Sequence, residues 1–79
     1  MAWVSVAPHD LAANTLIRCG TLRAHVLSWR WWVHRSEYVV DVCYDDSAPS
    51  TYRGAFTQVV YRPGENAVAW QEDQRTSAM

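Results

Sequence analysis

The stretch LRAHVLSWRWWV at residues 22–33, followed by EYVVDVCY at residues 37–44, decides the fold. The second stretch alternates cleanly between its two sides and predicts a β-strand. The first stretch is ambiguous, because its apolar residues recur both at helical spacing (Leu22, Val26, Trp29, Val33) and in strict alternation (Leu27, Trp29, Trp31, Val33).

Pairing the two stretches resolves the ambiguity in favour of a strand. A turn at His34–Ser36 joins residues 22–33 to residues 37–46 as an antiparallel hairpin. One face of this hairpin then carries four apolar cross-strand pairs, and the other face places Arg30 opposite Asp41, which is a favourable charge pair. A helix over 21–33 is the alternative, and it would separate Trp31 from Trp32 with no such match.

The remaining segments complete an α+β prediction. Asp10 can cap a short helix over residues 11–19, and Gly20 can follow the end of that helix. Residues 52–62 and 67–72 read as two further strands, with a possible bulge at Gly54 and a hairpin loop at 63–66. That loop places Tyr61 opposite Val68 and Val59 opposite Trp70.

We therefore predict one domain over residues 1–79, in which a short N-terminal helix packs on a four-stranded antiparallel β-meander. Residues 1–9 form an N-terminal arm, which could include a short edge strand, and residues 74–79 form a flexible tail. The predicted core consists of Leu16, Ile17, Leu27, Trp29, Trp31, Val33, Tyr38, Val40, Val42, Val59, Tyr61, Val68 and Trp70. Apolar residues expected on the opposite face of the sheet are Val26, Val39, Phe56 and Val60.

Composition limits the classes of function. The 79 residues include five Trp and four Tyr, which argues against disorder. Seven basic residues, all Arg, and eight acidic residues give a net charge of −1, so no strong field of either sign indicates a polyanionic or polycationic partner. No signal peptide and no run of apolar residues long enough to span a membrane is present, so we expect a cytoplasmic protein with free thiols at Cys19 and Cys43.

No arrangement of residues predicts catalysis, a metal or a cofactor. Cys19, His25, His34 and Cys43 lack the close spacing of zinc ligands. In the predicted register His25 and Cys43 point to opposite faces, which leaves the thiol without a base. Adjacent acidic residues are typical of turns, and the three glycines form no phosphate-binding loop.

The most unusual stretch is SWRWWVHR at residues 28–35. Trp and Arg together are enriched in binding hot spots, and the predicted register leaves Trp32 on the outer face. We predict a partner-binding surface made of Arg30, Trp32, Arg35, Val39 and Asp41. The alternative is that Trp32 only pads the sheet, or is covered by the N-terminal arm through Trp3.

Three functional hypotheses follow. The leading one is a non-catalytic protein-binding module, a small inhibitor or accessory protein. Small proteins with which phages and mobile elements block host machinery, such as anti-CRISPR proteins, belong to this class; only size, compactness and the lack of catalytic motifs point to it. The second is a module for single-stranded nucleic acid or nucleotides, and the third is a small enzyme subunit. A protein partner is expected, and a homodimer is possible through an exposed face or edge strand.

Overall fold

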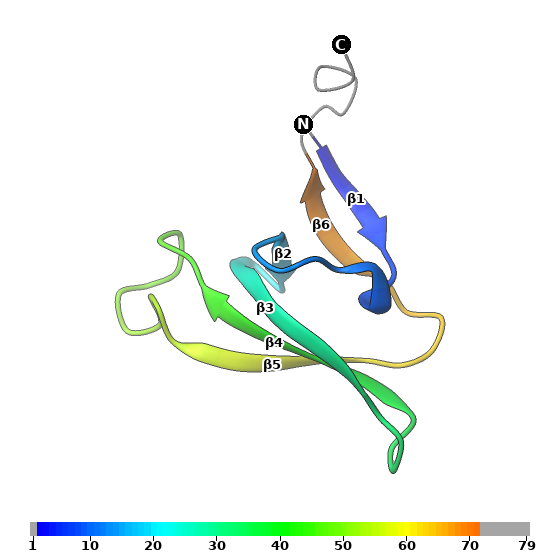
Figure 1. The fold of residues 1–79 in the computed structure, drawn as a ribbon. Helices are drawn as coiled ribbons and strands as arrows, with labels where there is room; N and C mark the ends of the chain where they lie inside the picture. The colour runs from blue at the N-terminus through cyan, green and yellow to red at the C-terminus, as the bar shows by residue number, and fades with distance from the viewer. Residues whose placement is uncertain (1, 72–79) are drawn as a thin grey trace.

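The computed structural model describes residues 2–71 and folds them into one antiparallel sheet (Figure 1). Its six strands are β1 (Ala2–Val6), β2 (Leu16–Cys19), β3 (Leu22–Trp32), β4 (Glu37–Tyr44), β5 (Phe56–Tyr61) and β6 (Ala67–Gln71). A single 3₁₀ turn, η1 (Pro8–Asp10), lies between β1 and β2. The spatial order is β1-β6-β2-β3-β4-β5, so β2 to β5 form a meander and β6 returns to pair with both β1 and β2. No helix within this described part is long and apolar enough to cross a membrane.

The predicted helix over residues 11–19 is wrong, and with it the α+β fold class. Residues 16–19 form β2 instead, and the chain before them already pairs with β3: the N–H of Asn14 donates to the carbonyl of Val26. Asn14 also has a φ of 71°, which no α-helix accommodates. The described residues are therefore nearly all β.

Gly20 was read as the residue that ends a helix, and it is instead the first residue of a two-residue hairpin turn. Cys19 pairs with Leu22, so Gly20 and Thr21 alone join β2 to β3. The φ of Gly20 is 66°, a value that a tight hairpin turn needs at this position and that glycine adopts without strain. A helix end and a hairpin turn use the same residue for the same backbone reason, which is why the sequence does not separate them.

The predicted hairpin between β3 and β4 is confirmed, with its register shifted by two residues. Trp29 lies opposite Val40, and Trp31 lies opposite Tyr38. The turn covers residues 33–36 and holds Ser36 at a positive φ of 52°. This even shift keeps residues 28–32 and 37–44 on their predicted faces, because side chains alternate with a period of two. The predicted faces of Val26 and Leu27 are wrong: Val26 is buried in the core and Leu27 is exposed, because β3 changes phase before Ser28.

A β-bulge at Leu27 links two alternating patterns within β3. Val26 pairs with Val42 and Ser28 pairs with Asp41, so Leu27 is an extra residue on this strand. The bulge places Ala24 and Val26 on the same face as Trp29 and Trp31. We call this the inner face, and the face that carries Arg30 and Asp41 the outer face. Gly54 lies just before β5 with a φ of 72°, and its N–H donates to the Tyr44 carbonyl while the Tyr44 N–H donates to the Ala55 carbonyl, so two residues oppose one there, as in the predicted bulge.

The predicted β5–β6 hairpin is wrong. β6 lies between β1 and β2, with Trp70 opposite Trp3 and Ala69 opposite Ile17. This reverses the predicted faces of β6: Ala67 and Ala69 are buried, whereas Val68 is 41% exposed. Residues 67–70 are apolar on both sides, so alternation could not select a face, and pairing with two distant strands did.

The core is built from small side chains and contains no tryptophan. Ile17, Val40 and Val42 are buried as predicted, and Leu16, Tyr38, Val59, Tyr61 and Trp70 are partly buried. Leu27, Trp29, Trp31, Val33 and Val68, predicted to be core, are exposed. The central cluster consists of Leu11, Ile17, Ala24, Val26, Val40, Val42, Ala67 and Ala69. The predicted arm forms the edge strand β1, and the predicted tail at 74–79 lies outside the described residues.

The central position of Ile17 leads to a stability prediction. Ile17→Ala leaves a cavity between Ala24 and Ala69 and is expected to lower the free energy of unfolding by about 2–5 kcal/mol in urea denaturation. Val68→Ala is the control, because this exposed side chain should cost under about 1 kcal/mol. Equal losses for the two variants would contradict the observed faces of β6.

The bulge leads to a second prediction. Deleting Leu27 removes the extra residue and makes Val26 and Ser28 neighbours, so β3 alternates regularly with Ala24, Val26, Trp29 and Trp31 still on the inner face. We expect the deletion variant to fold with both faces unchanged and to keep the NMR contacts between the Trp31 and Tyr38 rings. Loss of those contacts in a folded deletion variant would show that Leu27 is not the extra residue of β3.

Candidate binding surface

The distal half of the β3–β4 hairpin, residues 28–41, extends past the strands that cover the core (Figure 1). β3 has 11 residues, whereas its neighbour β2 has only 4. Among the described residues no strand pairs with β3 on that side beyond Val26. The hairpin therefore carries its side chains on two faces that the rest of the chain covers only in part.

On the inner face, four aromatic rings pack on one another, and we call this group the aromatic cluster. Tyr38 is at its centre, with ring centroids 5.9 Å from Trp29, 4.7 Å from Trp31 and 5.7 Å from His9. Both Trp contacts with Tyr38 are edge-to-face, a geometry that aromatic quadrupoles favour. Trp29 and Trp31 nevertheless stay 38% and 42% exposed, so the cluster is ordered and still open to a partner.

On the outer face, Trp32 is 41% exposed and lies beneath a cation. The Arg35 guanidinium carbon is 5.0 Å from the centre of the Trp32 ring, within cation–π range. Trp3, the residue considered as a cover for Trp32, instead packs edge-to-face on Trp70 at 5.1 Å. Trp3 therefore does not cover Trp32, and Trp32 and Arg35 form one exposed pair.

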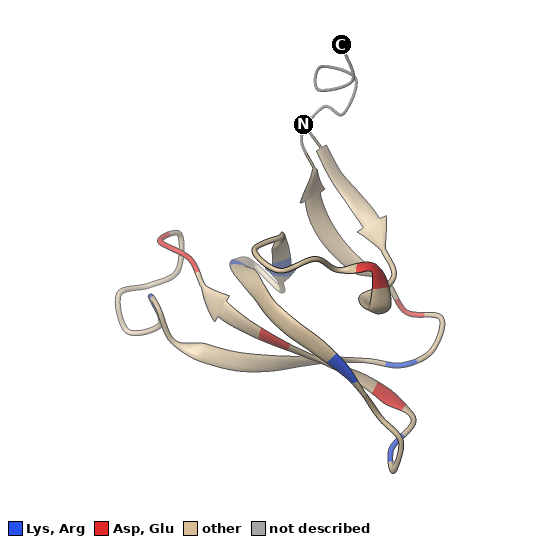
Figure 2. Cartoon of the chain, viewed as in Figure 1, with Lys and Arg blue, Asp and Glu red and all other residues tan. Residues whose placement is uncertain are grey.

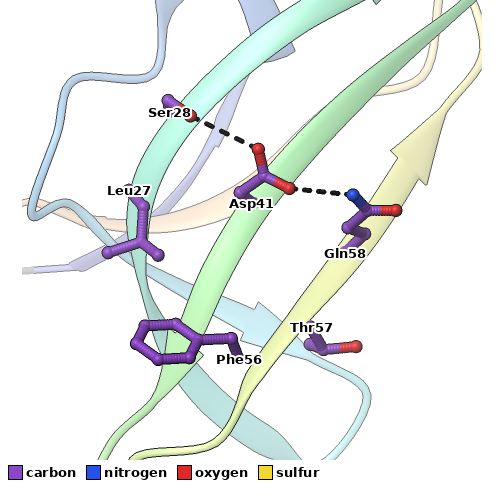
Figure 3. A pocket seen from close by; sticks show the side chains of 6 residues that line it. All are labelled: Leu27, Ser28, Asp41, Phe56, Thr57 and Gln58. Atoms are coloured by element: carbon purple, nitrogen blue, oxygen red, sulfur yellow. Dashed lines mark hydrogen bonds between the residues drawn. The ribbon is translucent and has the colours of Figure 1, made fainter.

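Arg30 and Asp41, predicted as a cross-strand pair, form an ion pair of 2.8 Å between Nη1 and Oδ2. They are diagonal neighbours, since Ser28 is directly opposite Asp41. The Ser28 hydroxyl and the Gln58 amide also donate to the Asp41 carboxylate, at 3.4 and 3.1 Å (Figure 3). Three donors occupy this carboxylate, so it links β3, β4 and β5 and is poorly placed to act as a general base.

A shallow groove of about 500 Å³ lies beside this network on the outer face. Leu27, Asp41 and Phe56 line it together with Ser28, Thr57 and Gln58, and the Phe56 ring extends across β4 toward Leu27 (Figure 3). Leu27 is placed there by the bulge. One end of the groove is apolar, and the other end is the Asp41 network, in which the carboxylate is paired with Arg30. No other charged side chain of the described residues lines the groove.

The five predicted site residues thus divide into three parts. Arg30 pairs with Asp41, and Trp32 pairs with Arg35. Val39 is only 1% exposed, lying between Arg30 and Val60, so it supports the surface from below. Sequence reasoning assigned Trp29 and Trp31 to the core and missed their exposure. The sequence signal for this exposure was the length of the alternating pattern in β3, which is longer than any apolar segment that could cover it.

The predicted separation of His25 and Cys43 is wrong, because the observed register places them directly opposite each other. The Cys43 thiol donates to the carbonyl of its neighbour Tyr44, at 3.8 Å, rather than to the imidazole. Within residues 2–71, no group of three or more His, Cys, Asp or Glu side chains is close enough together to hold a metal ion. The two residues therefore form neither a thiolate pair nor the start of a ligand set in this geometry.

Among residues 2–71, three groups have a shifted pKa. Burial raises the pKa of the Cys19 thiol. Burial also raises the pKa of Tyr61, with smaller contributions from Cys19 and Glu65. Burial opposes ionisation of Asp45, but hydrogen bonds from the Ser47 hydroxyl and N–H, with Arg23 nearby, hold its pKa below the ordinary value. Asp45 anchors the loop after β4 through its ion pair with Arg23, at 3.2 Å.

Cys19 supplies a test for thiol chemistry. Because burial raises its pKa, less thiolate exists at neutral pH than in the unfolded chain. In a Cys43→Ala background we expect iodoacetamide at pH 7.5 to alkylate Cys19 more slowly in the folded protein than in the urea-unfolded chain. Faster labelling of the folded protein would indicate an activated thiol and would reopen catalysis.

Comparison with protein-family models, curated proteins and solved structures finds no match to this chain, so what it does must be argued from its own surface.

Proposed function

We propose that this chain is a non-catalytic protein-binding module whose site is the distal half of the β3–β4 hairpin. One observation carries the proposal: three tryptophans, Trp29, Trp31 and Trp32, are each about two-fifths exposed on a single projecting hairpin. Large exposed apolar patches mark interaction sites, and Trp is among the residues most enriched in binding hot spots.

Packing within the aromatic cluster supports the proposal energetically. Rings that already contact Tyr38 and His9 have little conformational entropy left to lose when a partner arrives. At two-fifths exposure, three indoles offer roughly 300 Å² of apolar surface, or about 7 kcal/mol of transfer free energy. Association costs about 4–15 kcal/mol, so we expect the partner to contact more than the three indoles.

The charge distribution favours a protein over a nucleic acid. Apart from the adjacent Asp45 and Asp46, the basic and acidic residues of the described part of the chain lie singly along the strands and loops rather than in a stripe (Figure 2). Arg30 is engaged by Asp41, and Arg35 is the remaining cation beside the exposed indoles. Nucleic-acid affinity depends largely on several free cations that contact phosphates, which this surface does not supply. An inhibitor or accessory protein that masks a surface of its partner fits a small domain of this kind.

Site-specific photo-crosslinking tests the proposal. A benzophenone amino acid replaces Trp31 or Trp32 and, as a matched control, Tyr52, an exposed aromatic residue in the loop before β5. In cells that express the chain, we expect the two hairpin positions to crosslink one specific protein, and position 52 to give at least about tenfold less product.

Two results would overturn the proposal. Equal crosslinking from position 52 would place the contact elsewhere. Crosslinked species from the hairpin that collapse on nuclease treatment would show that the partner is a nucleic acid. Trp31→Ala and Trp32→Ala variants, checked for folding by circular dichroism, should each lose capture of the same protein in a reciprocal pull-down.

A further inference from the structure

β5 is an edge strand without the usual protection of an edge. Its sequence, FTQVVY at residues 56–61, contains no charge, no proline and no glycine, and five of its six residues favour strands. Natural edge strands are normally protected by Lys, Pro, a bulge or a covering segment, because their free backbone groups template further pairing. Within residues 2–71 no strand pairs with the outer side of β5.

The hydrogen-bond pattern identifies which backbone groups are free. The N–H of Tyr44 donates to the carbonyl of Ala55 at 3.0 Å, so the backbone of Ala55 points toward β4. In an antiparallel ladder the N–H and C=O of one residue point to the same side, and successive residues alternate. The groups of Phe56, Gln58 and Val60 therefore point to the free edge.

We propose that two copies of this chain pair through these edges, β5 against β5, about a two-fold axis at Gln58. If the two sheets are to share the same inner and outer faces, each even-numbered residue of one β5 must lie opposite an even-numbered residue of the other β5, and each odd-numbered residue opposite an odd-numbered one. Centring the axis on Gln58 pairs Phe56 with Val60 of the second copy, and it lets all three outward residues of each strand exchange hydrogen bonds. Centring it on Val59 instead leaves only two outward residues of each strand paired, so the Gln58 register is favoured.

We call the proposed β5–β5 contact the seam. Its side chains are complementary to the same side chains of the second copy. Phe56 is 75% exposed and Val60 is 46% exposed, and both lie on the outer face with Gln58. In the Gln58 register Phe56 of each copy lies opposite Val60 of the other copy, so this apolar pair occurs twice, and no charged side chain of the strands meets another. The nearest carboxylate, Asp41, is already neutralised by Arg30 and held by Gln58.

The seam is small, which sets the expected strength. Two apolar side chains per copy bury far less than the ~600 Å² per partner of the smallest stable specific interfaces. We therefore expect a reversible monomer–dimer equilibrium, detectable by sedimentation equilibrium between about 1 µM and about 1 mM.

Val60→Lys tests the seam, with Val68→Lys as the matched control, since Val68 is similarly exposed on β6, away from β5. A lysine at position 60 places a charge against the Phe56 of the other copy and should weaken dimerisation at least about tenfold, while Val68→Lys should leave it unchanged. Circular dichroism confirms that each variant is folded. A wild type that stays monomeric throughout, or a dimer that survives Val60→Lys, overturns the proposal.

A disulfide tests the register. With both native cysteines replaced by alanine, Gln58→Cys places two thiols across the axis at the Cα separation that disulfides need. Oxidation should yield a covalent dimer from Gln58→Cys and none from Val59→Cys. The reverse result would move the axis to Val59 and overturn the Gln58 register, and crosslinking of neither variant would overturn the paired edge.

Discussion

The structure depends on one extra residue in β3. Leu27 opposes no residue of β4, and this bulge changes the phase of the strand halfway along its length. Before the bulge the inward side chains are small, Ala24 and Val26, and they lie in the core. After it the inward side chains are Trp29 and Trp31. Without the phase change, the strand could not place the small residues and the indoles on one face.

The length of β3 explains why the indoles remain exposed. β2 pairs with β3 only up to His25, and residues 14–15 extend that contact to Val26. Beyond Val26 the hairpin extends past β2 and residues 14–15, so within the described chain no second layer packs on Trp31. The rings pack on one another instead, and each edge-to-face contact contributes about 0.5–1.5 kcal/mol beyond area burial. The chain thus stabilises its hairpin through the same surface that it leaves available.

Local patterns predicted the centre of the sheet and failed at its borders. The β3–β4 hairpin, the faces of its distal half and the Arg30–Asp41 pair followed from alternation and charge, both of which act between neighbouring strands. The position of β6 did not follow, because apolar residues at 67–70 satisfy either face and only contacts with β1 and β2 decide between them. β2 was mistaken for a helix because Gly20 suits a hairpin turn and a helix end equally well.

Tryptophan itself was misleading. A small domain is expected to bury its largest side chains, and the predicted core followed that rule. Here Leu11, Ile17 and three valines occupy the centre with three alanines, and the curved sheet brings β2, β3 and β6 close enough that small residues fill the space. Side-chain volume alone could not predict which residues form the core, because the composition of the core also depends on how many strands meet there.

The two proposed surfaces impose a constraint on each other. In a β5-paired dimer the sheet continues through both copies, and the two β3 strands are separated by four strands, or about 24 Å at ~4.8 Å per step. A two-fold axis normal to the sheet reverses strand direction, and Tyr61 at one end of β5 lies beside Tyr38 near the hairpin turn. The two hairpins must therefore point in opposite directions. A dimer built in this way presents two separate aromatic surfaces and favours a partner that is itself bivalent or repeated, whereas a single compact partner would contact one hairpin only.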